Sequence, residues 1–352
     1  MKILHISMIA PDIEHFGGAE RTNKIKNKLK EKHEIKSIHV HHWNALSDEY
    51  IEEDDYVLIL GREDMIAKSD DRLNFNFGLV SHITRSKRII FNLNKFVKRF
   101  NPDFVLIEQP YLYFLAKTLN YLKDAKLILS SHNLERDFFE NDRHLIVEAE
   151  NYFRDNAYRV LCTTQSEKDF YGDKAKVFPN ASDNLIDTKL DHWKNELDNG
   201  HVNYVFIGGY HPPNFESINA LTKHLKDDNV KIWVVGECGK DVDESPSINT
   251  LNVLSKEDMD GITLASDGLI NPIIDGGGTS LKVAKYLLTN KPIISTNFGM
   301  RGFEEYIDEG VYCYDNLKEL AESLSTKRPE FKRNNNLTWD EALKDLISFI
   351  EN

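Results

Sequence analysis

The fold is decided by residues 269–302, which read LINPIIDGGGTSLKVAKYLLTNKPIISTNFGMRG. Residues 269–274 form a short apolar run, which is typical of the end of a buried strand. The next residues, from Asp275 to Thr279, include a run of glycines, and glycine allows a tight turn and a close approach of the backbone to a ligand. We expect Thr279 to cap a helix over residues 280–289, because apolar side chains recur there at helical spacing.

A strand and a loop complete this segment as a β-α-β unit. Residues 292–296 form the second apolar strand, and residues 297–302 form a loop that contains two glycines. In such a unit the glycine loop lies at the start of the helix, where free backbone N–H groups and the helix dipole favour a phosphate. The sequence therefore predicts a phosphate-binding loop at residues 275–279.

The order of these parts resembles the donor-binding signature of glycosyltransferase family 4, whose members are retaining sugar-nucleotide transferases of GT-B fold. In that signature a proline strand, a GGGT loop, a Leu-Lys helix start, a Lys-Pro strand and a Gly-x-x-Gly loop follow one another. The residues that carry the resemblance are Pro272, Gly276, Gly277, Gly278, Thr279, Leu281, Lys282, Lys291, Pro292, Gly299 and Gly302. The chain departs from the family at Lys285, where the family usually has a glutamate that contacts the nucleotide ribose.

The resemblance implies a fold, a reaction and a donor site. The fold class is α/β, of GT-B type, with two Rossmann-like domains facing across a cleft. The reaction is that of a hexosyltransferase-like glycosyltransferase, which moves a sugar from a nucleotide-sugar donor to a glycan, lipid-linked or protein-linked acceptor with retention. Lys282 is the cation expected to neutralise the leaving diphosphate and so to take part in catalysis. The implied donor-binding residues are Gly208, Gly209, Asp275, Gly276, Gly277, Gly278, Thr279, Ser280, Leu281, Lys282 and Lys285.

Length and composition set wider limits. A chain of 352 residues, of which 41% are hydrophobic, suits two domains of ordinary size. Its net charge of −13 argues against nucleic acid as a general partner. No apolar run approaches the about 18 residues of a membrane-spanning helix, and the first residues indicate a strand rather than a signal peptide. The three cysteines are too widely spaced for a disulfide framework or a zinc site, so we expect a cytoplasmic protein.

Two strand-glycine-helix openings predict two Rossmann-like domains. We expect the first domain, which would bind the acceptor, over residues 1–182. The second domain, which would bind the donor nucleotide, is expected over residues 201–334. The polar residues 181–200 are interpreted as the linker, and residues 335–352 as a C-terminal helix that crosses back to the first domain.

The second opening contains a strand at residues 203–207 and a loop from Gly208 to Asn214 that includes Gly209 and a Pro-Pro pair. Family members with a Gly-x-x-x-Pro-Pro-Asn loop match it directly. Many other members have an arginine and a lysine near here that hold the donor diphosphate, and this chain has neither. The cation must then come from elsewhere, and Lys282 is the nearest candidate in the signature.

The first opening follows a strand at residues 2–7. After a loop, a helix begins with Gly17, Gly18 and Glu20. Ligands of open α/β sheets bind at the carboxyl ends of the strands, so this loop is expected to face the cleft. A similar loop in family 4 lies beside the acceptor and the diphosphate, which implies an acceptor role for these residues. The alternative is a helix that merely begins at glycines.

A histidine follows the strand predicted at residues 126–130. His132 would lie in the cleft rather than the core, and in the family a histidine of this loop contacts the donor sugar. Glu135, three residues later, is expected on the acceptor side of the cleft. As an acid–base group His132 has no evident orienting partner in the sequence, whereas as a hydrogen-bond donor to the sugar it needs none. A structural role in the loop is the alternative.

The histidines near the end of the second strand do not predict a metal site. His39, His41 and His42 lie along the end of a strand without a carboxylate partner, which is a weak pattern for metal binding. We therefore expect no metal. We also expect no cofactor, because the nucleotide-sugar is a co-substrate.

A basic segment runs from Arg85 to Phe100 with the sequence RSKRIIFNLNKFVKRF. It predicts an amphipathic helix with a cationic face, which is a local reversal of sign in an acidic chain. Such helices can rest on anionic lipid, so peripheral contact with the inner membrane face would be made here. The alternative is a core helix whose cationic face is solvated.

Two functions of different classes fit the sequence. One is the glycosyltransferase, and the other is a non-catalytic GT-B subunit that binds a glycan, an acceptor protein or a partner transferase. Lys285 favours the subunit, whereas the GGGT loop, Lys282 and His132 favour the enzyme. An NAD-dependent enzyme is excluded more simply, because no Gly-x-Gly-x-x-Gly follows the first strand and no acidic residue ends the second.

Overall fold

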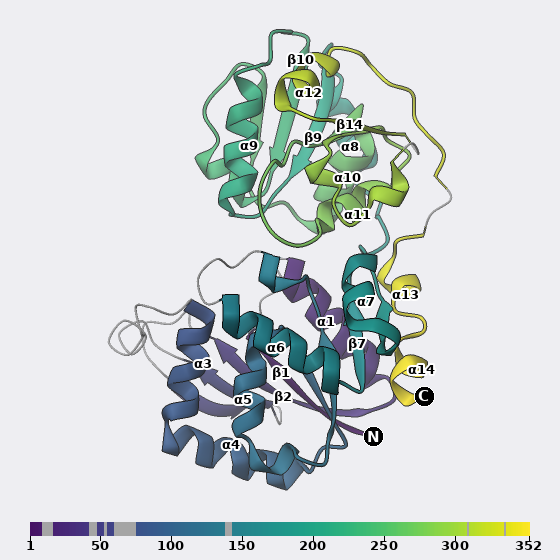
Figure 1. Cartoon of the computed structure of the whole chain (residues 1–352). Helices are drawn as coiled ribbons and strands as arrows, with labels where there is room; N and C mark the ends of the chain where they lie inside the picture. The colour runs from purple at the N-terminus through teal and green to yellow at the C-terminus, as the bar shows by residue number, and fades with distance from the viewer. Residues whose placement is uncertain are drawn as a thin grey trace. The chain divides into compact units, whose positions relative to one another are not determined.

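The computed structural model describes residues 1–8, 17–41, 48–52, 55–59, 75–137, 143–307, 310–333 and 336–352. The chain forms two compact units (Figure 1). The N-terminal unit comprises Met1–Pro179 together with Leu343–Asn352, and the C-terminal unit comprises Asn180–Ala342. Each unit is built on its own sheet with helices packed against it.

The sheet of the N-terminal unit contains β1 (Lys2–Ser7), β2 (Glu34–His41), β3 (Asp48–Glu52), β4 (Asp55–Ile59), β5 (Phe104–Glu108), β6 (Lys126–Ser130), β7 (Arg159–Cys162) and β8 (Ala175–Val177). Their spatial order is β3-β4-β2-β1-β5-β6-β7-β8. Neighbours pair in parallel, except β3 and β4, which are antiparallel. From β1 the chain first forms β2, β3 and β4 on one side of β1. It then returns to form β5 on the other side of β1. The topological switch point, where ligands of such sheets bind, therefore lies between β1 and β5.

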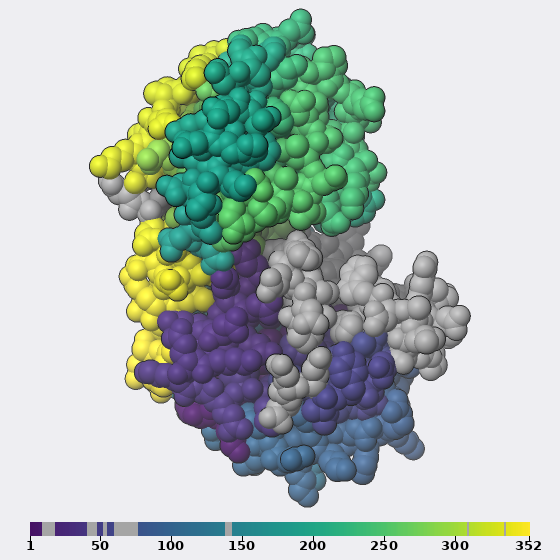
Figure 2. Space-filling view, turned by 180° about the vertical axis from the view of Figure 1, so that it is seen from behind, coloured from purple at the N-terminus to yellow at the C-terminus, as the bar shows by residue number. Residues whose placement is uncertain are grey.

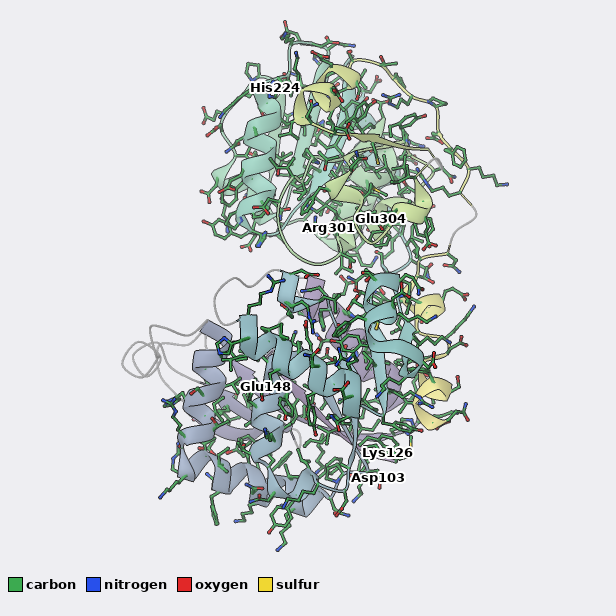
Figure 3. All side chains as sticks on the ribbon, viewed as in Figure 1. Asp103, Lys126, Glu148, His224, Arg301 and Glu304 are labelled. Carbon is green, nitrogen blue, oxygen red and sulfur yellow. The ribbon has the colours of Figure 1, made fainter. Side chains whose placement is uncertain are left out.

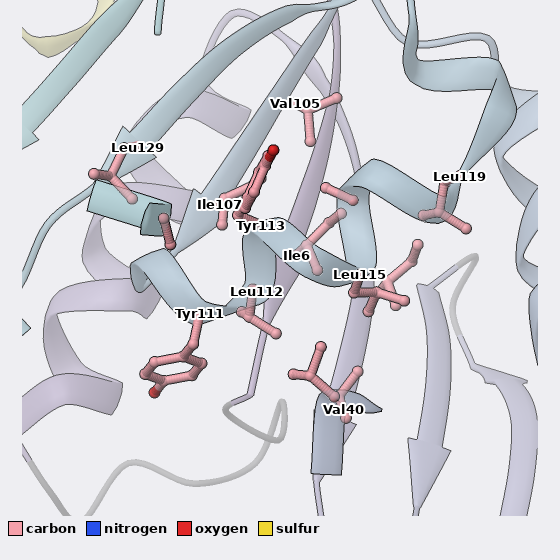
Figure 4. Packing of buried hydrophobic residues seen from close by; sticks show 14 of the residues in the cluster. Ile6, Val40, Val105, Ile107, Tyr111, Leu112, Tyr113, Leu115, Leu119 and Leu129 are labelled. Atoms are coloured by element: carbon pink, nitrogen blue, oxygen red, sulfur yellow. The ribbon is translucent and has the colours of Figure 1, made fainter. Parts of the chain in front are cut away.

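Helices cover this sheet and complete its core. They are α1 (Gly17–Lys30), α3 (Phe75–Arg85), α4 (Lys87–Phe100), α5 (Tyr113–Thr118), α6 (Arg143–Asn156), α7 (Gln165–Tyr171) and α14 (Leu346–Glu351), with 3-10 turns η1 (Pro110–Leu112), η2 (Asn120–Leu122), η3 (Glu135–Asp137) and η4 (Gly172–Lys174). Figure 4 shows how Ile6, Val105 and Ile107 of the strands share one buried cluster with Leu112 and Leu115. Strands of a covered parallel sheet are apolar on both faces, which explains their continuous apolar runs.

The basic segment is helical and amphipathic, and its cations are exposed. Arg85 ends α3, and Ser86 starts α4, because its side chain accepts a hydrogen bond from the backbone N–H of Ile89 at 3.4 Å. The apolar side of α4 is buried. The exposed side carries the cations and also Phe91, whose exposed fraction is 69%. Among the described residues no helix is long and apolar enough to cross a bilayer.

The C-terminal unit has a six-stranded parallel sheet. Its strands are β9 (Val202–Ile207), β10 (Val230–Val235), β11 (Ile248–Leu251), β12 (Gly268–Asn271), β13 (Ile293–Thr296) and β14 (Val311–Tyr314). Their spatial order is β11-β10-β9-β12-β13-β14, so the switch point of this sheet lies between β9 and β12. The helices are α8 (Leu190–Leu197), α9 (Pro212–Thr222), α10 (Lys256–Ala265), α11 (Leu281–Leu287), α12 (Leu317–Ser323) and α13 (Trp339–Ala342), with 3-10 turns η5 (Glu237–Asp241), η6 (Phe298–Met300) and η7 (Glu304–Tyr306).

Residues 181–200, which we interpreted as a linker, belong to the C-terminal unit. They contain α8, whose Trp193 and Leu197 are buried in the same apolar cluster as Ile262 of α10. The Trp193 indole donates a hydrogen bond to Asp258 at 3.2 Å. The segment looked like a linker because a two-turn helix buries few side chains and leaves the others polar.

The C-terminal residues form two short helices instead of the single helix expected over 335–352. Trp339, in α13, is bonded through its backbone N–H to the carbonyl of Ser182 at 3.1 Å, within the C-terminal unit. The next helix, α14, belongs to the N-terminal unit, where it packs against α1. In Figure 2 the yellow C-terminal residues lie directly beside the purple N-terminal segment. The Lys176–Asp345 ion pair, at 2.8 Å, supports this attachment.

Truncation of Leu197 tests whether α8 is part of the core. We expect Leu197→Ala to lower the free energy of unfolding by about 2–5 kcal/mol, because the side chain is buried and leaves a cavity. The neighbouring exposed residue gives a matched control, and Glu196→Ala should change stability by less than about 0.5 kcal/mol. Urea unfolding followed by tryptophan fluorescence measures both. Equal effects of the two variants on stability would support the interpretation of residues 181–200 as a linker.

Candidate functional site

Three side chains of the N-terminal unit meet at the carboxyl edge of its sheet, beside the switch point. Glu108 ends β5, His5 lies on the adjacent β1, and His132 follows β6. Glu108 is fully buried, and its two carboxylate oxygens contact different rings. Oε2 lies 2.7 Å from Nε2 of His132, and Oε1 lies 3.2 Å from Nε2 of His5.

This cluster corrects the expectation that His132 has no orienting partner. Burial alone would raise the pKa of Glu108, but hydrogen bonds from His132 and His5 outweigh it and hold that pKa below its usual range. Burial lowers the pKa of His5. Glu108 therefore carries a charge next to the imidazole of His132. Its signal in the sequence was a single acidic residue at the end of the apolar run Phe104–Glu108.

The residues expected on the acceptor side belong to the same unit. Gly17 and Gly18 open α1, as the sequence predicted, and Glu20 lies in its first turn. The next residue, Arg21, is buried and donates a hydrogen bond to the carbonyl of Phe178 at 2.7 Å. Arg21 thus anchors the start of α1 to the segment after β8, a role that the sequence did not indicate. The acceptor role of the glycines and Glu20 stays a prediction.

Glu135 lies in η3, three residues after His132, and is buried. Burial, together with the charge of Glu150, raises the pKa of Glu135 to about 8. Glu150 is itself paired with Arg136. Glu135 is therefore protonated near neutral pH, which makes it a hydrogen-bond donor close to the His132 loop.

His39 of β2 lies beside a carboxylate of the same unit. His39 is buried, with Nε2 3.4 Å from the carboxylate of Asp55, which also accepts a hydrogen bond from Lys26 at 2.8 Å. Among the residues that the structure describes, no group of three or more His, Cys, Asp or Glu side chains is placed to hold a metal ion. His42 lies outside the described residues.

The glycine loop of the C-terminal unit lies between β12 and α11. The helix begins at Leu281 with Ser280 as its N-cap residue, not at Ser280 with Thr279 as the cap. The Thr279 hydroxyl is instead engaged by the side-chain amide of Asn180. A hydroxyl that accepts a hydrogen bond from another segment ties the loop to that segment rather than to the first turn of the helix.

Arg301 holds this loop from one side. Its guanidinium donates to the carbonyl of Gly278 at 2.5 Å and to the carbonyl of Gly277 at 3.0 Å. In a trans peptide the N–H points opposite to the preceding carbonyl, so the N–H groups of Gly278 and Thr279 point away from Arg301. These N–H groups donate no hydrogen bond to any residue that the structure describes. Arg301 is labelled in Figure 3 at the edge of the C-terminal unit.

The backbone conformation explains why the loop needs glycine at two of its three positions. Gly276 has φ +120° and Gly278 has φ +68°, which are conformations that other residues rarely adopt. Gly277 is exposed and is not among the residues with positive φ. The backbone conformation at position 277 therefore allows a side chain in the protein without a bound ligand.

Lys282 is the second cation at this loop. Its ammonium donates to the side-chain oxygen of Asn214 at 2.7 Å and lies 4.1 Å from the centre of the Phe206 ring. Asn214 also donates to the carbonyl of Gly209 at 3.0 Å, so it joins the loop after β9 to α11. Burial, with the Arg301 charge acting in the same direction, lowers the pKa of Lys282 to about 7.

Two of the expected donor residues have evident structural roles. Gly208 is buried, and a Cβ there would lie 2.8 Å from the sulfur of Cys238, so the position is tightly packed. Lys285 does not join Lys282 at Asn214, because its ammonium forms an ion pair with the fully buried Asp260. The carboxylate of Asp260 also accepts from Lys256 at 2.8 Å.

The arrangement can bind an anion. It offers two backbone N–H groups without a hydrogen-bond acceptor, and two basic side chains, Arg301 and Lys282, that have no carboxylate bonded to them among the described residues. Successive backbone N–H groups in such turns form concave anion sites. Sequence reasoning found the glycines and Lys282 but missed Arg301, whose signal was its place between the two glycines of the second loop.

No protein-family model matches the chain. An uncharacterized 44.6 kDa protein in the cps region of Klebsiella pneumoniae is 23% identical over 235 residues, which cover 57% of this chain and 58% of that protein. The chain thus spans little more than half the length of this curated relative.

Solved structures match over almost the whole chain. Sucrose-phosphate synthase from Thermosynechococcus elongatus has a TM-score of 0.68 at 9% identity and covers 100% of this chain and 98% of its own. HepE from Anabaena, in complex with UDP and glucose, has a TM-score of 0.62 at 12% identity, with coverage of 92% and 89%. Trehalose 6-phosphate synthase from Burkholderia multivorans has a TM-score of 0.61 at 11% identity, with coverage of 100% and 93%. The likeness is one of fold, and it confirms the GT-B class expected from the sequence.

The lowered pKa of Lys282 predicts a pH-dependent stability. Between pH 7 and the unfolded value of about 10.4, the unfolded chain holds a proton that the folded chain lacks. The cost of burying the ammonium is therefore complete below pH 7 and disappears as the pH rises toward 10. We expect Lys282→Met to be more stable than the parent at pH 6, with the difference fading by pH 10.

Urea unfolding at pH 6, 8 and 10 measures this difference. The exposed Lys223 provides the control, because Lys223→Met should show no such trend. A Lys282→Met variant whose stability relative to the parent is independent of pH would contradict the buried-ammonium interpretation.

Proposed function

We propose that the protein is a retaining glycosyltransferase that moves a sugar from a nucleotide-sugar donor to a glycan, lipid-linked or protein-linked acceptor. The observation that carries the proposal is the glycine loop of the C-terminal unit. Arg301 turns the carbonyls of Gly277 and Gly278 to one side, and this leaves the N–H groups of Gly278 and Thr279 free on the other. Lys282 lies in the first turn of the helix that follows. Support also comes from the GT-B fold shared with a protein solved in complex with UDP and glucose.

The chemistry of the site suits a departing diphosphate. Negative charge develops on the leaving group as the bond from the sugar to the diphosphate breaks, and preorganised N–H donors stabilise such charge. Donors of this kind contribute about 2.7–4 kcal/mol each in oxyanion holes. Lys282 has a pKa of about 7 before an anion binds, and a bound diphosphate would favour its charged form.

The N-terminal unit would supply the groups for the transferring sugar and the acceptor. His132, oriented by Glu108, would contact the sugar. Glu135, protonated near neutral pH, would donate a hydrogen bond beside it. Gly17, Gly18 and Glu20 open α1 at the same carboxyl edge and would face the acceptor.

The nucleoside would be held in a different manner from that of most family 4 members. A glutamate would accept hydrogen bonds from both ribose hydroxyls, whereas the ammonium of Lys285 has only donors and is engaged by Asp260. The donor would then be bound mainly through its phosphates, with the ribose contacted by another residue. No metal or cofactor takes part in this proposal.

A non-catalytic GT-B subunit is the second candidate function. The ion pair of Lys285 with the buried Asp260 favours it, because it gives Lys285 a structural role in place of a nucleotide contact. Such a subunit would bind a glycan, an acceptor protein or a partner transferase. It has no use for two unsatisfied N–H groups beside Lys282, and for this reason we place the enzyme first.

Replacement of Gly277 tests the donor site. We expect Gly277→Val to lose binding of nucleoside diphosphates by at least about tenfold, because its side chain would stand where phosphate oxygens approach the N–H groups. The fold should persist, since Gly277 needs no positive φ. Calorimetric titration with UDP, ADP and GDP measures the affinities, and circular dichroism checks the fold.

A substitution at Gly278 distinguishes a disrupted loop conformation from a blocked ligand contact. Gly278→Ala should lower stability by about 1–2 kcal/mol, because φ at this position is +68°. Unchanged diphosphate affinity in a folded Gly277→Val protein would overturn the donor site. Absence of binding by the parent protein to all three diphosphates would favour the non-catalytic subunit.

Vesicle sedimentation tests the membrane contact proposed for the segment from Arg85 to Phe100. Binding to anionic vesicles should exceed binding to neutral ones and should fall with salt, because the Debye length shortens. Phe91→Ser should weaken it, since this exposed ring is placed among the cations of α4. Phe331→Ser, an exposed phenylalanine of the C-terminal unit, is the control. Equal sedimentation with both lipids would leave α4 as an ordinary core helix.

A further inference from the structure

The contacts of Glu108 decide which nitrogen of each neighbouring histidine carries a proton. An ionised carboxylate only accepts hydrogen bonds. Both of its oxygens are engaged, one by Nε2 of His132 at 2.7 Å and the other by Nε2 of His5 at 3.2 Å. Each Nε2 must therefore carry a hydrogen. In a neutral imidazole the other nitrogen, Nδ1, is then an acceptor.

The surroundings of the two rings differ in one respect. Nδ1 of His5 is buried and has no hydrogen-bond partner among the described residues. It can remain there as an acceptor, but a hydrogen on it would be a buried donor without a partner, which is costly. The side chain of His132 is 12% exposed, so a hydrogen on its Nδ1 can reach water or a ligand.

We infer that Glu108 is a positioning residue that fixes the His132 ring, so that Nδ1, and not Nε2, is the atom offered to a bound sugar hydroxyl. In the neutral ring Nδ1 accepts the hydroxyl hydrogen, and after protonation it donates to a sugar oxygen. His5 occupies the second oxygen of Glu108 and prevents the carboxylate from rotating. The sugar as ligand rests on the proposed function, whereas the tautomer assignment does not.

The surrounding residues keep this arrangement in place. His5 also meets the ring of His39 edge to face, with ring centres 6.2 Å apart. His39 in turn lies beside Asp55, which is paired with Lys26. The polar side chains of β1, β2, β4 and β5 thus form one continuous buried set. Two members of the set are partly exposed: His132 at the carboxyl edge of the sheet, with a side chain 12% exposed, and Asp55 on β4, with 16%.

An isosteric substitution gives a sharp test. In Glu108→Gln the amide has one accepting oxygen and one donating NH₂ group. Only one of the two histidines can then keep its hydrogen on Nε2, and the other must accept from the NH₂ group. Because a hydrogen on Nδ1 of His5 would be orphaned, His132 is the ring that must change. We expect His132 to switch from the Nε2–H to the Nδ1–H tautomer, while His5 stays as it was.

The experiment is a long-range ¹H–¹⁵N spectrum of the full chain labelled in histidine and recorded at pH 9. Signals are assigned with the single variants His132→Asn and His5→Asn. His224, an exposed histidine of the C-terminal unit labelled in Figure 3, is the internal control and should not change. The measurement needs no ligand, so its outcome is independent of nucleotide binding.

The possible outcomes separate clearly. Nε2–H signals for both rings in the parent protein and an Nδ1–H signal for His132 alone in Glu108→Gln support the inference. An Nδ1–H tautomer of His132 in the parent protein overturns it, and so does a Glu108→Gln spectrum with His132 unchanged. Because the parent spectrum is itself decisive, the inference stays testable even if the variant does not fold.

Discussion

Parallel strands need helices on both faces, and this constraint leaves the carboxyl ends of the strands as the place where both candidate sites lie. Side chains in the middle of such strands are apolar because helices cover them above and below. In each unit the polar groups of the candidate site lie toward the carboxyl ends of the strands, near the switch point of the sheet. Glu108 ends β5 beside β1, and the glycine loop follows β12 beside β9. The two sites therefore occupy equivalent places in their two sheets.

Buried charge is the second theme of the structure. Glu108 and Asp260 are both fully buried carboxylates, and each is stabilised by two side-chain partners. Lys282 differs, because its partners are a neutral amide and a ring face, and burial lowers its pKa to about 7. A cation left without a counter-charge in a polar loop costs stability. An anionic ligand that binds at the loop would supply the missing negative charge and offset this cost. This is the physical argument for a phosphate at the loop.

Lys285 has a structural role in the C-terminal unit. The signature that the sequence resembles usually has a glutamate at this position, whereas here Asp260 on the neighbouring α10 is the partner of a lysine. The pair ties α11 to α10, and the backbone N–H of Ile186 also bonds to Asp260, at 3.1 Å. The Lys285–Asp260 pair is thus part of the packing of the C-terminal unit.

The sequence by itself determined the GT-B class and the order of strands and helices around the glycine loop, and it predicted positions at which ligands would bind. These follow from local patterns: apolar runs, glycines at tight turns and the spacing of one signature. Only the tertiary structure decided which distant residues contact one another. The pairing of His132 with Glu108 spans 24 residues, and that of Arg301 with Gly278 spans 23. Residues 181–200 were misjudged as a linker, because a short helix such as α8 shows its buried side only when its neighbours are known. Pairing of distant residues depends on which strands lie side by side, and no local pattern carries that information.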